Sequence, residues 1–215
     1  MGKRSYNQYC AVARGLDVVG DRWTLLLVRE LLLGPKRYGD LLAASPGIGT
    51  NLLADRLREM ETMGLVERVT LPPPAGSSVY RLTEAGAELE TVVRAIGRWG
   101  RRFMGPQRED EKLSIGAYFI ALRERFRPER ATGLHEAYEF RVDGRVFEVR
   151  VDDGACTTSE GSGARPTATF AMDVETLNAI FLGEVTAEQA TADGRVEVTG
   201  DAEALSRFQE MFAPA

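Results

Sequence analysis

The chain has 215 residues, 44% of them hydrophobic, which suits one large or two ordinary globular domains, and no run approaches the roughly 20 apolar residues of a membrane span. With Cys10, Cys156 and His135 as its whole supply of cysteine and histidine, the chain is not a disulfide scaffold, and neither a zinc site, another metal, a cofactor nor an enzyme is expected. Residues 1–105 carry 15 basic and 11 acidic side chains, whereas residues 106–215 carry 12 and 21, which favours two domains with separate roles.

The N-terminal residues predict a cytoplasmic protein, because Lys3 and Arg4 are not followed by the apolar segment of a secretory signal. Two helices are predicted next, over residues 9–19 and 23–33, with a break at Gly20 and Asp21. The carboxylate of Asp21 is expected to cap the second helix.

Residues 37–82 have the pattern of a helix-turn-helix followed by a two-stranded wing. A short helix around residues 38–42 is followed by a turn at 45–47 and by the predicted recognition helix, in which Leu53, Leu57 and Met60 repeat at helical spacing. Gly64 suits the end of that helix, and strands are predicted over 65–71 and 79–82 with the turn 72–78 between them. Thr83 is expected to cap one long apolar helix over residues 84–104.

The candidate DNA-binding residues lie on the face of the recognition helix opposite the apolar stripe, just before the helix-turn-helix, and on the wing. Asn51 can pair with adenine and Arg58 with guanine in the major groove, and Asp55 either reads a cytosine amino group or stays solvated. Arg56 forms either an internal ion pair or a phosphate contact. The full set is Arg37, Thr50, Asn51, Ala54, Asp55, Arg56, Arg58, Arg68 and Arg81.

Several motifs of the first half occur in a specific order, namely Cys10, residues 20–31 (GDRWTLLLVREL), 37–41 (RYGDL), Gly47-Ile48, Arg56-Leu57, 64–68 (GLVER) and 80–86 (YRLTEAG). In this order and spacing the chain resembles the HxlR family of bacterial winged-helix transcriptional regulators. The resemblance implies a homodimer formed by the first and last helices of this half. It also implies double-stranded DNA as partner, with two half-sites about one helical turn apart.

The sequence departs from the family pattern at two positions. Gly49 stands where the family usually has a helix-capping serine, and we expect Thr50 to take over the cap. Ala11 follows Cys10 where the family usually has proline. Some relatives sense oxidants near this position, so Cys10 is either a redox sensor or a small buried residue at the head of a dimer helix.

The second half begins after a polar junction at residues 105–111, so the predicted domains are 1–105 and 106–215. Its pattern predicts a helix over 113–124, two strands around 138–142 and 147–151 with turns at Asp143-Gly144 and Asp153-Gly154, and further strands at 155–160, 167–171 and 195–199. Helices are predicted after the caps Asp173 and Asp201 and over 186–192. The fold class is α+β, with an antiparallel-rich sheet covered by helices in this half.

A second resemblance, to the sterol carrier protein family, is carried by Phe170, Asp173, Leu177, Gly183, Ala190, Gly194, residues 196–198, Gly200, Asp201 and Leu205. This family implies an apolar tunnel between a sheet and its helices. The candidate ligand-binding residues either line such a cavity or simply fill a core, and they are Phe119, Tyr138, Phe140, Leu177, Ile180, Phe181, Phe208, Met211 and Phe212.

Together these patterns predict a dimeric transcriptional regulator controlled by a hydrophobic small molecule. Two alternatives stay open at this point. In one, the C-terminal domain only stabilises the dimer; in the other, the regulator responds to oxidants through Cys10.

Overall fold

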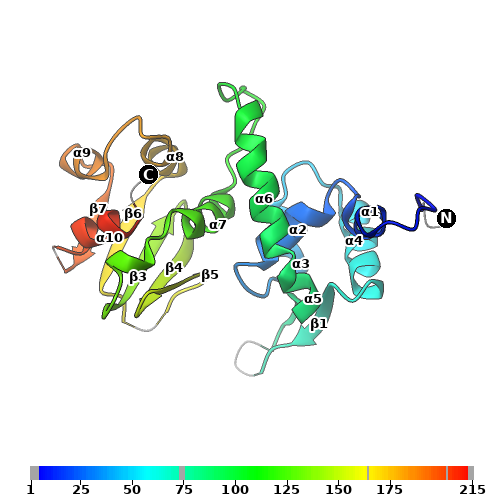
Figure 1. The fold of residues 1–215 in the computed structure, drawn as a ribbon. Coiled ribbons are helices and arrows are strands. Elements are labelled where there is room, and N and C mark those ends of the chain that lie inside the picture. The colour runs from blue at the N-terminus through cyan, green and yellow to red at the C-terminus, as the bar shows by residue number, and fades with distance from the viewer. Residues whose placement is uncertain (1–4, 73–75, 164, 202, 213–215) are drawn as a thin grey trace. The chain divides into compact units, whose positions relative to one another are not determined.

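The computed structural model describes residues 5–72, 76–163, 165–201 and 203–212. The chain divides into two compact units, residues 1–103 and residues 104–215, and each is considered by itself (Figure 1). Within the described ranges, no helix is both long and apolar enough to cross a membrane.

Unit 1, residues 1–103, consists of helices and one small antiparallel sheet. Its elements in chain order are α1 (Ala11–Val19), α2 (Thr24–Leu31), α3 (Tyr38–Ala44), α4 (Thr50–Thr62), β1 (Val66–Thr70), β2 (Ser78–Leu82), α5 (Glu84–Glu88), α6 (Glu90–Gly100) and the 3₁₀ turn η1 (Arg101–Phe103).

The core of unit 1 is built around α2, whose Leu27, Val28 and Leu31 are buried. The stripe predicted on α4 is confirmed, because Leu53, Leu57 and Met60 are all buried in the same cluster. Gly64 ends α4 in the left-handed conformation, with φ +70°. The helix-turn-helix therefore packs against α2.

Three local predictions for unit 1 had different outcomes. The Thr83 cap is confirmed, since its hydroxyl accepts a hydrogen bond from the amide of Gly86 at 3.1 Å. The Asp21 cap is wrong, because α2 starts after Trp23 without a side-chain cap and the Asp21 carboxylate pairs with Arg56 instead. The continuous helix over 84–104 is also wrong, since it breaks at Leu89 into α5 and α6.

Unit 2, residues 104–215, combines one sheet with helices. Its elements are α7 (Ile115–Arg125), the 3₁₀ turn η2 (Pro128–Arg130), β3 (His135–Val142), β4 (Arg145–Asp152), β5 (Ala155–Glu160), β6 (Ala168–Met172), α8 (Val174–Leu182), α9 (Ala187–Ala192), β7 (Glu197–Gly200) and α10 (Ala204–Phe212).

The sheet of unit 2 has the order β5-β4-β3-β6-β7, and its neighbouring strands are antiparallel except for β3 and β6, which run parallel (Figure 1). Both predicted Asp-Gly turns are confirmed, because Asp143, Gly144, Asp153 and Gly154 all have positive φ. Alternate residues of β3 point to the helices, where Phe140 meets Phe119 of α7 and Phe208 of α10. One face of the sheet therefore packs against helices.

Candidate nucleic-acid interface and ligand cavity

The outer face of α4 presents polar side chains above the buried stripe. Asn51, Asp55 and Arg58 are exposed, whereas Ala54 is half-buried. Tyr38 of α3 holds the start of α4 in place, because its hydroxyl donates a hydrogen bond to the carbonyl of Thr50 at 2.6 Å. This fixes the start of α4 relative to α3, as a helix-turn-helix requires.

Two arginines of α4 have different surroundings. Arg56 is only 12% exposed and its guanidinium pairs with Asp21 before α2 and with Glu59 of α4. The internal ion pair, one of the two alternatives for Arg56, is therefore formed in this structure. Arg58 is 70% exposed and pairs at 2.6 Å with Asp55, one turn earlier on the same face.

The first turn of α4 has no side-chain cap. Gly49 is the residue before the helix, and Thr50 is already its first helical residue, so the expected capping role of Thr50 is wrong. A hydroxyl at Thr50 cannot fold back as a cap, because capping needs the extended backbone that Gly49 adopts here. Thr50 and Arg37 are both exposed, and the amide of Arg37 donates to Asp40 at the start of α3.

The wing consists of β1 and β2, and residues 73–75 of its predicted turn lie outside the described residues. Arg68 donates to Ser78 at 2.6 Å, and Arg81 pairs with Glu67 at 2.7 Å. Both arginines are exposed. A bridge between Lys36 and Tyr80 attaches the wing to the segment before α3, a contact that the sequence did not indicate.

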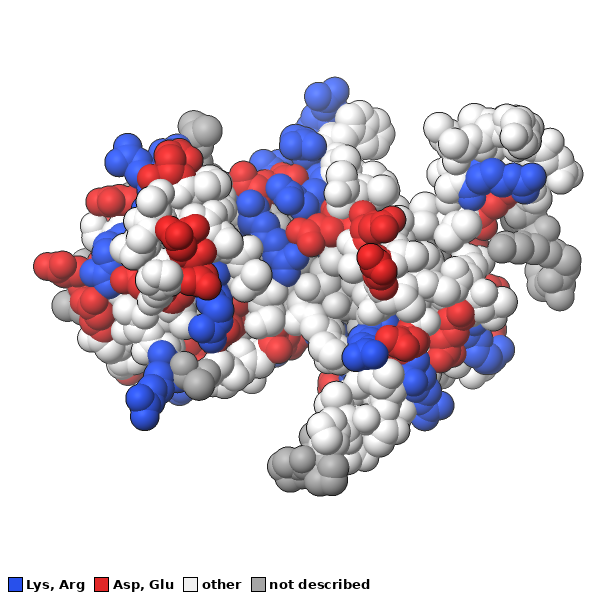
Figure 2. Space-filling view, turned by 60° about the horizontal axis from the view of Figure 1, so that its bottom comes forward, with Lys and Arg blue, Asp and Glu red and all other residues white. Residues whose placement is uncertain are grey.

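The surface charge is mixed on the visible face. Figure 2 shows basic and acidic side chains interleaved, without one continuous basic area among the coloured residues. On α4 itself Asp55 offsets part of the charge of Arg58.

Cys10 is exposed and immediately precedes α1, so the alternative of a buried residue does not describe its environment in the single chain. The backbone amides of Ala13 and Val12 lower the pKa of its thiol, because free N–H groups at a helix start favour the thiolate.

Large apolar side chains are exposed on the first and last helices of unit 1. On α6 and η1, Val92, Ile96, Trp99 and Phe103 follow helical spacing, and Trp99 and Phe103 are 58% and 68% exposed. On α1, Val12 and Leu16 are exposed in the same way. Contiguous apolar stripes of this kind are typical of protein interfaces.

An apolar cavity of about 290 Å³ lies in unit 2 between the sheet and its helices. Seven of the nine predicted ligand-binding residues line it, namely Phe119, Phe140, Leu177, Ile180, Phe181, Phe208 and Phe212. They come from α7, β3, α8 and α10, so the cavity depends on elements that are far apart in sequence.

Tyr138 and Met211 do not line the cavity, which corrects the prediction for these two residues. Tyr138 is fully buried, its ring contacts Phe170 and Phe208, and its hydroxyl donates to Glu136. Met211 is enclosed in the packing of α10. Sequence reasoning missed other lining residues, and the alternation within β6 gave a signal for two of them, Phe170 and Met172.

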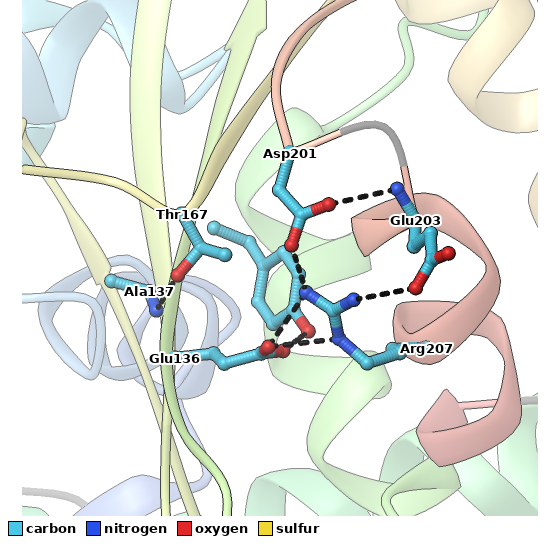
Figure 3. A network of polar contacts seen from close by, with 7 residues as sticks. Glu136, Ala137, Thr167, Asp201, Glu203 and Arg207 are labelled. Carbon is cyan, nitrogen blue, oxygen red and sulfur yellow. Dashed lines mark hydrogen bonds and ion pairs between the residues drawn. The ribbon is translucent and has the colours of Figure 1, made fainter.

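Arg207 attaches α10 to the sheet. The same helix contributes Phe208 and Phe212 to the cavity. The guanidinium of Arg207 lies between Glu136 of β3 and Asp201, which it contacts at 2.8 and 2.6 Å (Figure 3). The hydrogen bond from Arg207, followed by that from the amide of Glu203, lowers the pKa of Asp201. Asp201 also accepts this amide at 2.9 Å, in the turn just before α10 begins at Ala204.

Comparison with known proteins gives each half a different match. Residues 18–108 match the model of the HxlR-like helix-turn-helix, and residues 111–215 match that of the alkyl sulfatase C-terminal domain. The second description differs from the sterol carrier family named above.

Relatives of the first half are transcriptional regulators of the helix-turn-helix type. One from Mycobacterium tuberculosis is 39% identical over 105 residues, which is 49% of this chain and 65% of that protein. YodB of Bacillus subtilis is 36% identical over 90 residues, which is 42% of this chain and 80% of YodB. Among solved structures, the redox regulator HypR in its oxidised form is 32% identical, covers 45% of this chain and 99% of that one, and superposes with a TM-score of 0.41. Through its first half, the chain belongs to the HxlR-like helix-turn-helix family of transcriptional regulators.

Proposed function

We propose that the chain is a dimeric DNA-binding transcriptional regulator, controlled by a hydrophobic small molecule in unit 2. The observation that carries the DNA-binding part is α4, which buries Leu53, Leu57 and Met60 beneath an exposed polar face. A helix of this kind fits the major groove of B-DNA, where Asn and Arg side chains read base edges. The arginines of the wing would contact the phosphate backbone beside it.

Arg58 is the side chain of α4 best suited to a base or phosphate contact, because it is exposed and its partner Asp55 is a neighbour on its own helix. DNA sites selected from a random duplex library provide the probe. In a gel-shift titration, Arg58→Ala should weaken binding roughly tenfold or more, as expected for loss of a bidentate base contact. Arg130→Ala, an exposed arginine of unit 2, serves as the control and should bind as the wild type does. Equal affinities of wild type and Arg58→Ala would remove Arg58 from the contact set.

The proposed dimer is supported by the exposed apolar stripes of α1 and α6. A second copy of the chain is the partner best suited to cover them, because the two recognition helices of a dimer can then enter successive major grooves. Two linked contacts also compensate for the modest positive charge of each copy.

Control by a ligand is supported by the cavity of unit 2, since an apolar cavity between packed elements is a favourable site for an apolar molecule. We infer a sterol carrier-like role in which unit 2 binds such a molecule. For the ligand to act as an effector it must prefer one dimer geometry, and such coupling is typically about 1–3 kcal/mol. In the competing proposal unit 2 only stabilises the dimer, and cavity ligands then leave DNA affinity unchanged.

Cys10 supports a second candidate, a regulator that responds to oxidants. Its exposure and lowered thiol pKa are the properties of a reactive cysteine. In this case a mild peroxide dose should change the DNA affinity of the wild type severalfold and leave Cys10→Ser unaffected. Cys156→Ser is the matched control, because burial raises the pKa of that thiol to about 11. The same peroxide response in Cys10→Ser and wild type contradicts this candidate.

A further inference from the structure

A second, polar pocket of about 200 Å³ lies at the sheet of unit 2. Its lining includes His135 and Ala137 of β3, Arg150 and Asp152 of β4, and Arg165 and Thr167 from the segment before β6. We propose that this polar pocket binds a small molecule that carries a phosphate group, and that Arg150 and Arg165 hold the phosphate. The site does not depend on the apolar cavity or on a ligand bound there.

The alternation of β3 places the polar pocket on the face of the sheet opposite the apolar cavity. Tyr138 and Phe140 contact Phe208 of α10, so Ala137 between them points away from the helices. Arg150 lies directly across from Ala137 in the antiparallel pairing of β3 with β4 and shares its face. Because Ala137 is small and buried, it leaves space beside the longer side chain of Arg150.

Arg165 reaches the polar pocket from the connection between β5 and β6. Its backbone has φ +56°, a left-handed conformation that is uncommon for a residue with a side chain. Such conformations cluster at ligand sites, where the surrounding structure maintains them. The side chain is exposed and forms no hydrogen bond or ion pair with another residue in the described ranges. Its five N–H donors are therefore available to a ligand.

Arg150 is oriented by an ion pair that uses only part of its guanidinium. Its Nε and Nη2 contact one carboxylate oxygen of Glu148 at 3.1 and 3.0 Å. Its Nη1 makes no hydrogen bond to the part of the chain that the structure describes. Because the guanidinium is a planar fork, one edge can bind the carboxylate while Nη1 binds an anionic oxygen of a ligand.

The two carboxylates that line the polar pocket each have a donor of their own. Glu136 contacts Arg207 at 2.8 Å and accepts from the hydroxyl of Tyr138, and Asp152 contacts Nδ1 of His135. Asp152 is also 69% exposed, so water and salt screen much of its charge. More distant acidic residues of unit 2 are screened beyond a Debye length of about 8 Å. The arginines therefore dominate the charge inside the pocket.

A phosphate group suits this arrangement of donors. Arginine binds phosphate oxygens through charge-assisted hydrogen bonds, which are about twice as strong as neutral ones. The hydroxyl of Thr167 accepts a hydrogen bond from the amide of Ala137 at 3.2 Å, so its own proton remains available for a phosphate oxygen (Figure 3). The volume is below the roughly 300 Å³ at which sites for drug-sized ligands begin, which favours free phosphate or a small monoester.

Ligands that differ in charge test the proposal on the full-length protein. Inorganic phosphate, glycerol 3-phosphate, dimethyl phosphate and glycerol are titrated by calorimetry at constant ionic strength. The tighter of the first two should bind roughly tenfold or more tightly than dimethyl phosphate, which carries a single charge and has two blocked oxygens, and glycerol should not bind. The order of the first two identifies free phosphate or the ester as the preferred form. Absence of binding by both, or equally tight binding of dimethyl phosphate, overturns the proposal.

Substitution of the arginines gives a second measurement. Arg150→Gln and Arg165→Gln each remove one charge and should each weaken binding of the tighter phosphate ligand roughly tenfold. Arg141→Gln is the matched control, because Arg141 shares the face of Ala137 on β3 but lies outside the pocket, and glutamine can still donate to its partner Glu139. This variant should bind as the wild type does. The same loss in all three variants would be a general effect of charge and contradicts the proposal.

Nuclear magnetic resonance distinguishes this pocket from the arginines of unit 1, which could also attract phosphate. Saturation with the tighter ligand should shift the amide signals of Ala137 and Thr167 in the wild type and in Arg58→Ala, which lacks an arginine of the DNA-binding face. Shifts confined to α4 and the wing would assign the phosphate to the DNA-binding face and contradict the proposal. The proposed DNA binding and the apolar cavity would be unaffected by that outcome.

Discussion

Arg56 and Arg58 lie two positions apart on α4 and should have separable effects. Arg56 is largely enclosed and links α4 to Asp21 before α2, whereas Arg58 is exposed and pairs with Asp55 on its own helix. Because a helix places such positions about 200° apart, one points toward the domain and the other toward solvent. A stability assay and a DNA-binding assay should therefore rank the two arginines in opposite order.

Arg56→Ala is expected to lower the free energy of unfolding of the protein by about 1 kcal/mol, since it removes a partly buried ion pair and its methylene packing. Chemical denaturation followed by circular dichroism measures the change. Arg58→Ala should alter the same quantity by less than about 0.5 kcal/mol, because exposed pairs of this spacing contribute little. A larger loss in Arg58→Ala than in Arg56→Ala contradicts this assignment.

At the scale of elements, α10 depends on a polar attachment to the sheet as well as on its apolar face. Phe208 and Phe212 pack against the aromatic residues of the cavity, and Arg207 bridges Glu136 and Asp201 (Figure 3). The attachment joins β3 to the start of α10, two elements more than 60 residues apart in sequence. Acid should weaken it, because its two acceptors are carboxylates.

The lowered pKa of Asp201 gives this weakening a direction. A depressed pKa in the folded state contributes stability that is present above the unfolded value of about 4 and is lost as the pH falls through the folded value. Arg207→Met removes the main cause of the shift. The stability of this variant should therefore fall less steeply than that of the wild type below about pH 4, in denaturant titrations at several pH values.

Arg130→Met provides the comparison for this experiment, because Arg130 is an exposed arginine of the same unit without a contact to Asp201. It should keep the wild-type dependence on pH. Identical acid profiles for Arg207→Met and the wild type would show that the attachment does not contribute to acid sensitivity.

At the scale of the whole molecule, the proposed function requires two copies of the chain. Trp99→Glu places a charge in the exposed stripe of α6 and should shift the protein from dimer to monomer in analytical ultracentrifugation. Its affinity for a two-half-site DNA should fall roughly tenfold or more, because each recognition helix then binds alone.

Gly97→Glu is the matched control for the dimer. It adds the same charge to α6 about a third of a turn away from the stripe, and a side chain there has open space around its Cβ. This variant should remain dimeric. Dissociation of both variants to the same extent would indicate a general effect of charge on α6, and an unchanged Trp99→Glu dimer would exclude the stripe from the interface.

Local patterns in the sequence were sufficient for the features that depend on neighbouring residues. Helical spacing identified the buried stripe of α4, the Asp-Gly pairs identified the two hairpin turns of unit 2, and Thr83 was identified as a cap. These features are encoded within a few residues, because spacing, turn conformation and capping are local properties of the backbone. The motifs of the first half also sufficed to indicate its family.

Only the tertiary structure decided which of several local possibilities was used. Asp21 pairs with Arg56, 35 residues away, and does not cap α2. Tyr138 packs outside the cavity, whereas Phe140 lines it. The parallel pairing of β3 with β6 and the position of Arg125 at the cavity likewise depend on contacts between segments that are distant in sequence. A side chain's periodicity determines the face on which it lies, but its partner depends on segments brought together by the chain's long-range packing.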